Sequence, residues 1–360
     1  MTVEETVRKI WEEERPSGRT AFFRAILSLL SIPYRASVAA RNVLYARSLL
    51  QQKHLPCRVI SVGNLTVGGT GKTPLVILLA NILKERGHRP AVLSRGYGGR
   101  SRAPVNVVTD GTQILMGWRE VGDEPVLIAQ STRGVPVLTG PRRLVTGRAA
   151  LEKFGADCLI LDDAFQHRAL YRDLDILLLD AGRPFGNGCL LPRGPLRESR
   201  DAVNRARLII RTGDGVEAQD IRDHGLTPIP TFRGHHRPEL LVEWRSGRPL
   251  PLSAIRGQKV CAFAGIGHPD SFRRSLIALG AEVAPFFAFP DHHPYSPSDV
   301  DRIQRLATQS GATQIITTEK DGVRLAELPA LLPNPLLLRI GMEINPVEPF
   351  TELIFSSLAY

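Results

Sequence analysis

The stretch Ser61–Pro74, SVGNLTVGGTGKTP, has the residue types of a loop that binds phosphate. It follows an apolar run and precedes a segment with helical periodicity, so backbone N–H groups and a helix N-terminus would point at an anion. Lys72 would reach the terminal phosphates of a nucleoside triphosphate, and Thr73 would offer its hydroxyl to Mg²⁺. The sequence therefore predicts a nucleotide-binding loop made of Thr66, Val67, Gly68, Gly69, Thr70, Gly71, Lys72 and Thr73.

One position departs from the common phosphate-loop pattern, which has glycine where this chain has Thr66. That position acts through the shape of the backbone, so the change removes no ligand. A glycine-rich turn that binds nothing is the alternative.

Two carboxylates, Asp162 and Asp163, end the apolar run in LILDDAFQH. The carboxyl ends of parallel strands meet at one edge of a sheet, where ligands of such sheets bind. Mg²⁺ prefers carboxylate oxygens and water. We therefore expect a metal site at these two residues, with Asp162 the stronger candidate, and a pair of loop-capping acids is the alternative.

Two further clusters could handle protons. GDEP places Asp123 and Glu124 before a helix-like segment, where Asp123 fits either an N-cap or a base for a hydroxyl nucleophile. The loop FPDHHPYSP contains Asp291, His292 and His293. Paired histidines can ligate a metal, but no third ligand follows at a suitable spacing, so we favour a proton-handling role over a purely structural loop.

Arginines lie beside glycine and proline in SRGYGGR, in LLPRGPLRE and at Arg142–Arg143. The guanidinium group binds phosphate through two parallel hydrogen bonds. Each arginine alone fits a solvated surface charge, but together they indicate a cleft for an anionic ligand.

The composition points to a negatively charged partner. The chain has 360 residues, a net charge of +10 and only 6% aromatic residues. Nucleic acid, an anionic membrane or a phosphorylated substrate would suit this charge, but few aromatic rings are available to stack on single-stranded bases. The four cysteines are widely spaced, which indicates free thiols in a reducing compartment. Met1–Arg15 is too polar for a cleavable signal peptide.

The N-terminal segment is basic and partly apolar. Between Arg15 and Lys53 there are seven basic residues and no acidic ones, around the apolar stretch AILSLLSIPY. As a helix those ten residues span about 15 Å, half of the roughly 30 Å hydrocarbon core of a bilayer. The pattern favours a helix in the membrane interface, attracted by anionic lipid. An amphipathic helix packed on the protein's own core is the alternative.

The remaining chain alternates apolar runs with helix-like segments. Runs without two-residue alternation indicate a parallel sheet that is covered on both faces. We predict an α/β fold with a P-loop NTPase-like core at 54–213, a β-stranded linker at 214–246 and a smaller α/β domain at 247–360. The segment 1–53 would precede them as a membrane-associated helical segment.

Seven strings together resemble one family. SVGNLTVGGTGKTP, LSRGYGG, VGDEP, LDDAFQH, LLPRGPLRE, DHH and TTEKDGVR run in this order between residues 61 and 324. The set is similar to the tetraacyldisaccharide 4'-kinases of Gram-negative bacteria. The resemblance implies transfer of the ATP γ-phosphate to the 4'-hydroxyl of a lipid-borne glucosamine disaccharide 1-phosphate, in the synthesis of lipid A. It also implies two α/β/α domains, with the active site in the cleft between them.

The resemblance also implies roles for single residues. An Asp–His pair that helps to deprotonate the sugar hydroxyl falls on Asp123 and His292, although His293 stays open as the partner. Lys72 is the third residue expected to act in catalysis. The other positions that match are Asp162 and Asp163 at the metal, Glu124 and His167 as supporting polar residues, and Arg143, Arg197 and Glu198 near nucleotide or substrate. Ala164 stands where many relatives are expected to have glycine, a change that is tolerated unless the residue needs a positive φ.

The expected cofactors are ATP and Mg²⁺, and the expected partners are a lipid substrate in the inner membrane and an anionic membrane surface. We expect a monomer that binds no nucleic acid and lies at the cytoplasmic face of the bacterial inner membrane as a peripheral or monotopic protein. The alternative is a nucleotide-switched ATPase of the ParA/MinD type, whose loop K-G-G-x-G-K-T overlaps VGGTGKT. Its signature lysine would fall on Val67, which disfavours that class.

Overall fold

The structure, a computed structural model, describes residues 7, 10–11, 18–213, 229–326, 328 and 334–358. Two units share the chain: unit 1 comprises residues 1–95, 142–235 and 343–360, and unit 2 comprises residues 96–141 and 236–342. Residues 214–228 of the predicted linker lie outside the described part. The domain boundaries that the sequence suggested stay predictions.

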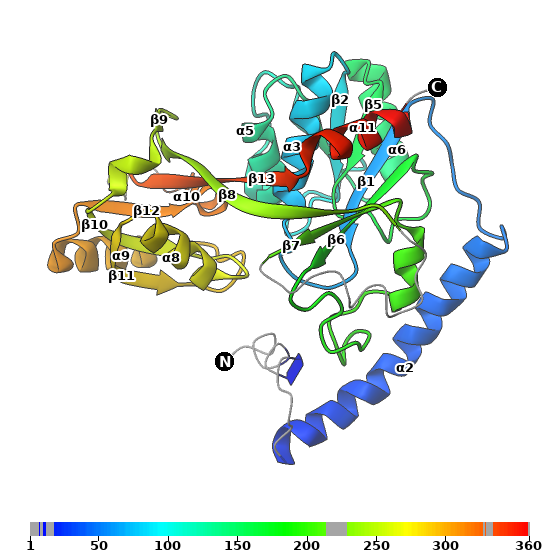
Figure 1. Cartoon of the computed structure of the whole chain (residues 1–360), viewed down its shortest axis with the longest axis horizontal. Helices are drawn as coiled ribbons and strands as arrows, with labels where there is room; N and C mark the ends of the chain where they lie inside the picture. The colour runs from blue at the N-terminus through cyan, green and yellow to red at the C-terminus, as the bar shows by residue number, and fades with distance from the viewer. Residues whose placement is uncertain are drawn as a thin grey trace. The chain divides into compact units, whose positions relative to one another are not determined.

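Unit 1 contains the parallel strands that precede the candidate ligand loops (Figure 1). Their order is β8-β7-β6-β1-β5-β2, and the pairings with printed register are all parallel. The bounds are β1 Arg58–Asn64, β2 Pro90–Ser94, β5 Cys158–Leu161, β6 Leu174–Asp180, β7 Leu208–Thr212 and β8 Thr231–Glu243. Nearly every residue of β1, β2, β5 and β7 is buried, which explains their unbroken apolar runs. The prediction of an α/β fold with a large, mainly parallel sheet is confirmed.

Helices cover these strands. The helix α3 (Lys72–Glu85) packs against β1, β2 and β5, and α6 (Arg143–Phe154) packs against β2. The helix α11 (Val347–Leu358) returns to unit 1 at the end of the described chain, and a 3₁₀ turn, η1, covers Arg200–Arg205. Because α3 begins at Lys72, the phosphate loop leads directly into a helix N-terminus, as the sequence predicted.

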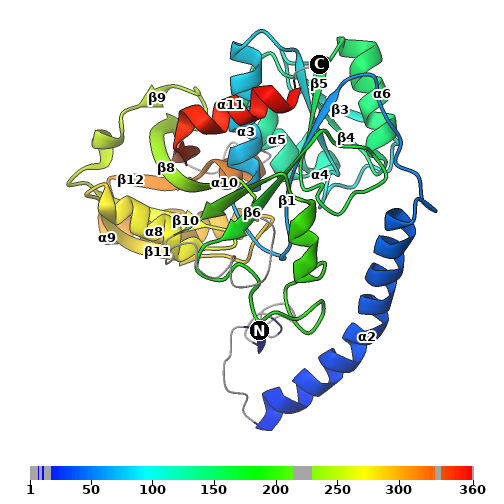
Figure 2. The ribbon, with the colours of Figure 1, turned by 45° about the vertical axis from the view of Figure 1, so that its right-hand side comes forward.

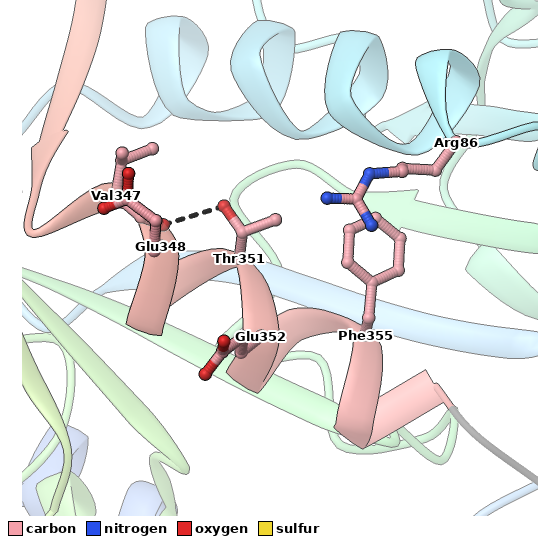
Figure 3. A pocket seen from close by; sticks show the side chains of 6 residues that line it. All are labelled: Arg86, Val347, Glu348, Thr351, Glu352 and Phe355. Atoms are coloured by element: carbon pink, nitrogen blue, oxygen red, sulfur yellow. Dashed lines mark hydrogen bonds between the residues drawn. The ribbon is translucent and has the colours of Figure 1, made fainter.

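A cavity of about 420 Å³ lies beside α11, at the other end of α3 from the phosphate loop (Figure 3). It is lined by Arg86, Val347, Glu348, Thr351, Glu352 and Phe355. The 14 residues of α3 separate Arg86 from the loop by about 20 Å along the helix axis. This cavity is therefore not the phosphate site.

The N-terminal helix α2 is much longer than its apolar stretch. It covers Gly18–Ala46, 29 residues, and includes Pro33 (Figures 1 and 2). None of its described side chains is buried, which argues against a helix packed on the protein's own core. Among the described residues, no helix combines the length and apolar character needed to cross a membrane.

Unit 2 has a second group of strands, in the order β11-β10-β12-β13-β8. They are β10 Lys259–Ala264, β11 Glu282–Ala288, β12 Gln314–Thr318 and β13 Leu336–Asn345, with β9 Pro249–Leu250 paired to β8 and a 3₁₀ turn, η2, at Leu252–Ile255. Alternate residues of β10 pack in two different clusters. Val260, Ala262 and Ala264 cluster with helix α8 (Pro269–Ala278), whereas Cys261 and Phe263 cluster with α9 (Pro297–Ser310). The two helices thus cover opposite faces of β10, because side chains of a strand alternate in direction.

The other segment of unit 2 positions Asp123. It contains β3 (Asn106–Thr109) antiparallel to β4 (Val137–Thr139), and α4 (Trp118–Val121) and α5 (Asp123–Ser131) lie between these strands along the chain. The helix α10 (Glu319–Leu325) packs against α5. The sequence analysis did not identify β3, which is only four residues long.

Candidate active site

Two glycines give the phosphate loop its shape. Gly68 has φ 133° and Gly71 has φ 84°, values that side chains with a Cβ rarely adopt. Asn64 supports the loop from the end of β1, since its Nδ2 donates to the carbonyl of Gly68 at 3.4 Å and to Oγ1 of Thr70 at 3.1 Å. The loop is therefore held open by backbone conformation and one buried amide.

Lys72 lies across this loop. Its Nζ lies 3.5 Å from the carbonyl oxygen of Gly68 and 3.7 Å from Oδ1 of Asp163. The ammonium group is thus close both to the loop that would hold the phosphates and to one of the two predicted metal-site carboxylates.

Thr66 forms part of a backbone connection. It pairs in an antiparallel bridge with Leu196, and Val67 N donates to the carbonyl of Pro195 at 2.8 Å. Thr66 is not among the residues of positive φ, so glycine is not required at this position. The unusual residue therefore ties the phosphate loop to the segment LLPRGPLRE. Ala164 does not have a positive φ either, so its methyl group is tolerated.

Asp162 and Asp163 lie in different surroundings. Asp162 is buried, and Oγ of Ser94 donates to its Oδ2 at 3.1 Å. Asp163 has φ 47°, and NH1 of Arg197 donates to its two carboxylate oxygens at 2.8 and 2.9 Å. Burial would raise the pKa of Asp163, but Lys72 and Arg197 outweigh burial and hold that pKa below its usual value. Asp163 is thus held as an anion by the two cations beside it.

The donor set around the loop suits magnesium. The Thr73 hydroxyl and the two carboxylates offer only oxygen ligands, the type that Mg²⁺ prefers. Within the described ranges, no group of three or more His, Cys, Asp or Glu could hold a metal. An ion here would therefore need oxygens from a nucleotide and from water. Since Asp163 is already engaged by Lys72 and Arg197, Asp162 is the better placed carboxylate.

The other predicted residues of unit 1 lie around this group. NH2 of Arg143 donates to the carbonyl of Asp162 at 3.3 Å, and burial lowers the pKa of Arg143 to about 10. His167 is neutral, because burial and then the charge of Arg143 lower its pKa to about 4. Glu198 is fully buried and forms ion pairs with Arg41 and Arg205. Its carboxylate therefore joins α2 to η1.

In unit 2, Asp123 is the first residue of α5. Gly122 before it has φ 91°, and a Cβ there would lie 2.3 Å from the carbonyl oxygen of Tyr97, so only glycine fits. Oδ1 of Asp123 accepts a hydrogen bond from the backbone N of Glu124 at 3.0 Å. A helix N-terminus stabilises such an anion.

His292 completes a pair with Asp123. Its Nδ1 lies 2.9 Å from Oδ2 and 3.1 Å from Oδ1 of Asp123. The Asp123 side chain is 5% exposed and that of His292 38% exposed, so the histidine is the accessible member. His293 points elsewhere: its Nε2 lies 3.1 Å from Oδ2 of Asp299, and its ring stacks on Phe289. Of the two histidines that the sequence left open, His292 is the one next to Asp123.

The pair is electrostatically polarised. Burial would raise the pKa of Asp123, but the hydrogen bond from His292 and the charges of Lys320 and Arg324 lower it to about 2. The same hydrogen bond raises the pKa of His292, against burial and the charge of Lys320. His292 has φ 58°, a strained conformation for a residue with a Cβ.

The sequence reasoning assigned no role to Lys320 or Arg324. Lys320 Nζ lies 3.3 Å from Oε1 of Glu124 and 3.3 Å from Nε2 of His292. Arg324 is fully buried, with Nε 3.5 Å from Oδ2 of Asp123. Both come from the string TTEKDGVR, which was part of the resemblance and was the available signal.

Comparison with known proteins identifies a family. A family model described as tetraacyldisaccharide-1-P 4'-kinase matches residues 23–358. The tetraacyldisaccharide 4'-kinase of Syntrophus aciditrophicus (strain SB) is 50% identical over 371 residues, 99% of each chain. That of Anaeromyxobacter sp. (strain Fw109-5) is 45% identical over 344 residues, 94% of this chain and 92% of its own.

A solved structure is similar as well. The crystal structure of LpxK from Aquifex aeolicus in complex with ATP matches with a TM-score of 0.79 at 34% identity, over 94% of this chain and 100% of that one. The family model spans nearly the whole chain, and relatives of the same name match it over nearly their full length. The chain therefore belongs to the tetraacyldisaccharide-1-phosphate 4'-kinase family.

Proposed function

We propose that this chain transfers the γ-phosphate of ATP to the 4'-hydroxyl of a tetraacylated glucosamine disaccharide 1-phosphate, a precursor of lipid A. The observation that carries the chemistry is the Asp123–His292 pair, with Nδ1 2.9 Å from the carboxylate. A pair of this kind suits a hydroxyl acceptor, which must lose a proton. The family's name describes the same reaction.

Unit 1 would bind the nucleotide as a P-loop NTPase-like core. The loop from Thr66 to Thr73 would surround the phosphates with backbone N–H groups, and Lys72 would neutralise charge on the γ-phosphate. Thr73 and Asp162, with Asp163 beside them, would hold Mg²⁺, which supplies charge neutralisation at the phosphate oxygens when bound. Arg197 would keep Asp163 ionised and in place. We keep the sequence-based boundaries as our proposal for the folding domains: core 54–213, linker 214–246 and C-terminal domain 247–360.

Unit 2 would supply the base. Asp123 is anionic and buried, and His292 is exposed enough to meet a substrate. The hydroxyl is a weak nucleophile, so a pair that accepts its proton as the phosphoryl group arrives lowers the barrier. Most of the acceleration would come from alignment and charge stabilisation by Lys72, the metal ion and the arginines.

The helix α2 would place the enzyme at a membrane. In its N-terminal half, the large exposed apolar residues are Phe22, Phe23, Ile26, Leu29, Leu30 and Ile32. Contiguous apolar side chains with nearby arginines suit the interface of an anionic bilayer. We propose a peripheral or monotopic protein at the cytoplasmic face of the inner membrane, where an acylated substrate stays in the bilayer. We also propose that it acts as a monomer.

Acceptor-dependent phosphoryl transfer tests this function. The full chain in detergent is incubated with γ-labelled ATP, Mg²⁺ and the lipid disaccharide 1-phosphate, and lipid products are separated. Label should appear at the 4'-position of the lipid, and Lys72→Ala should abolish it. ATP hydrolysis that is unaffected by the lipid, with no labelled product, would instead support the nucleotide-switch class.

A further inference from the structure

Lys320 occupies an unusual position beside the Asp123–His292 pair. Its side chain is only 18% exposed, and Nζ lies 3.3 Å from Oε1 of Glu124 and 3.6 Å from Oδ1 of Asp291. The same Nζ lies 3.3 Å from Nε2 of His292. Burial would lower the pKa of Lys320, but the carboxylates of Glu124, Asp123 and Asp291 outweigh it and raise that pKa. Lys320 is therefore an ammonium group fixed against the imidazole.

For each ring nitrogen of His292, the nearest polar group can act in only one way, as a hydrogen-bond acceptor or as a donor. Nδ1 faces the Asp123 carboxylate, which accepts only, and the nearest polar group to Nε2 is the Lys320 ammonium at 3.3 Å, which donates only, with Oδ1 of Asp291 farther away at 3.8 Å. The neutral imidazole with its proton on Nδ1 satisfies both contacts. The imidazolium ion would instead direct an N–H group at a cation.

Asp123 has the opposite effect to Lys320 on the protonation of His292, because an adjacent carboxylate favours the imidazolium ion. A pair that already holds an extra proton cannot accept the one that leaves a hydroxyl. A cation beside the far nitrogen opposes this state. Lys320 is such a cation, and α10, which carries it, packs against α5, which carries Asp123.

We propose that Lys320 is a positioning residue of the pair: its ammonium group opposes protonation of Nε2 and holds the neutral imidazole of His292 with its proton on Nδ1, facing Asp123. The importance of this state for catalysis rests on the function proposed above, whereas the state itself does not. Glu124, on α5, then holds Lys320 in place. This contact gives a physical role to Glu124, which the sequence analysis expected to be a supporting polar residue.

Other charged groups also face the pair. Asp123 and Glu124 approach from α5, Asp291 from the loop of His292 itself, and Lys320 and Arg324 from α10. Arg324 contacts Asp123, with Nε 3.5 Å from Oδ2. Tyr97 lies edge-on to the imidazole, with ring centroids 6.3 Å apart. Among the contacts of the described residues, Lys320 is the cation that lies within 4 Å of His292.

Nitrogen-15 NMR of the histidine side chains tests the proposal without any substrate. The full chain is labelled at the imidazole nitrogens and studied in detergent, and the His292 signals are assigned by their loss in His292→Gln. In the wild type we expect the neutral tautomer with the proton on Nδ1 at pH 8. In Lys320→Met and Lys320→Gln the His292 titration midpoint should move to higher pH, whereas Lys320→Arg should keep it near the wild-type value.

Lys259→Met is the matched control, since Lys259 is a surface lysine in the same unit that pairs with Glu282. It should leave the midpoint unchanged. If the enzyme phosphorylates its lipid, Lys320→Met should also move the acidic limb of the kcat profile to higher pH without changing the KM for ATP. A merely structural lysine would lower stability and leave the profile in place.

Two results would overturn the proposal. One is a wild-type His292 that is protonated on Nε2, alone or in addition to Nδ1, at pH 8. The other is an equal His292 midpoint in the wild type and in folded Lys320→Met and Lys320→Gln. Failure of lipid phosphorylation with the expected NMR result would reject the proposed function and leave this inference standing.

Discussion

Nδ1 of His292 lies 2.9 Å from Oδ2 of Asp123, although 169 residues separate them in the chain. The carboxylate is nearly fully buried, and the imidazole is partly exposed. The aspartate therefore orients and polarises the histidine from behind, while the histidine faces outward.

Asp123→Asn tests the contribution of the carboxylate. The amide keeps the size of the side chain but cannot accept the proton, so kcat should fall by about 10²- to 10⁴-fold. ATP affinity should change little, because the phosphate loop belongs to unit 1. Initial rates of lipid phosphorylation and calorimetric titration with an ATP analogue measure the two effects.

A matched control is Asp110→Asn. Asp110 is also a carboxylate of unit 2 whose pKa is lowered to about 2, in its case by hydrogen bonds from Thr112 and Gln113. It caps a turn and should leave kcat unchanged. If Asp123→Asn loses ATP binding to the same extent as activity, the assignment of Asp123 to proton transfer is wrong.

The pH dependence of kcat should follow His292. Its pKa is raised above the usual 6.5 by Asp123, and the pKa of Asp123 is lowered to about 2. Since the pair must lose its extra proton to accept another, kcat should rise with pH through a midpoint above 6.5. In His292→Gln the residual activity should lack this rise. A profile for His292→Gln that keeps the same acidic limb would assign the titration to another group.

Much of the fold could be predicted because its signals are local. The phosphate loop, the strand before it and α3 after it lie within 30 residues, so one stretch of sequence reveals them. The apolar runs of β6 and β7 were also clear, since most of their residues are buried. The segment 1–53 was expected to be helical, and α2 covers Gly18–Ala46 of it, well beyond the apolar stretch that gave the signal.

The candidate site was harder to predict because it depends on long-range contacts. Asp123 and His292 were candidates from their own residue types, but only the resemblance joined them as a pair, and the choice between His292 and His293 needed their opposite orientations. Lys320 was missed because a lysine at the start of a short helix has no distinctive signal. Its role becomes visible only when α10 is packed against α5.

Arg197→Gln tests the organisation of the phosphate site. Arg197 donates to both oxygens of Asp163, which also faces Lys72. Loss of a charged hydrogen bond of this kind costs about 1.5–3 kcal/mol, so ATP affinity should fall about tenfold or more. Arg193→Gln is the control, since its Nε donates to Ser28 on α2. Equal ATP affinity in both variants would contradict the role of Arg197.

Glu198→Gln should destabilise unit 1 without a primary effect on chemistry. Its fully buried carboxylate forms ion pairs with Arg41 of α2 and Arg205 of η1, and the variant leaves both guanidinium groups without their anion. The arginines keep partial access to water, so we expect a loss of about 2 kcal/mol in the free energy of unfolding. Urea denaturation measures it, with exposed Glu352→Gln as the control. An unchanged unfolding midpoint would show that α2 is held by other contacts.

The exposed face of α2 should determine membrane binding. Phe22, Leu29 and Leu30 are 65%, 68% and 53% exposed, so their replacement by serine removes apolar area that would enter the bilayer without disturbing a core. Each buried side chain of this kind contributes about 1.5–3 kcal/mol at most, so the triple variant should bind anionic vesicles at least about tenfold more weakly. Ile277→Ser, at an exposed position on α8, should bind as the wild type does. Vesicle sedimentation measures both, and undiminished binding of the triple variant would assign the membrane contact to another surface. The triple variant should keep ATP affinity, because Tyr34 and Arg41, whose contacts reach the Arg197–Glu198 segment, are unchanged.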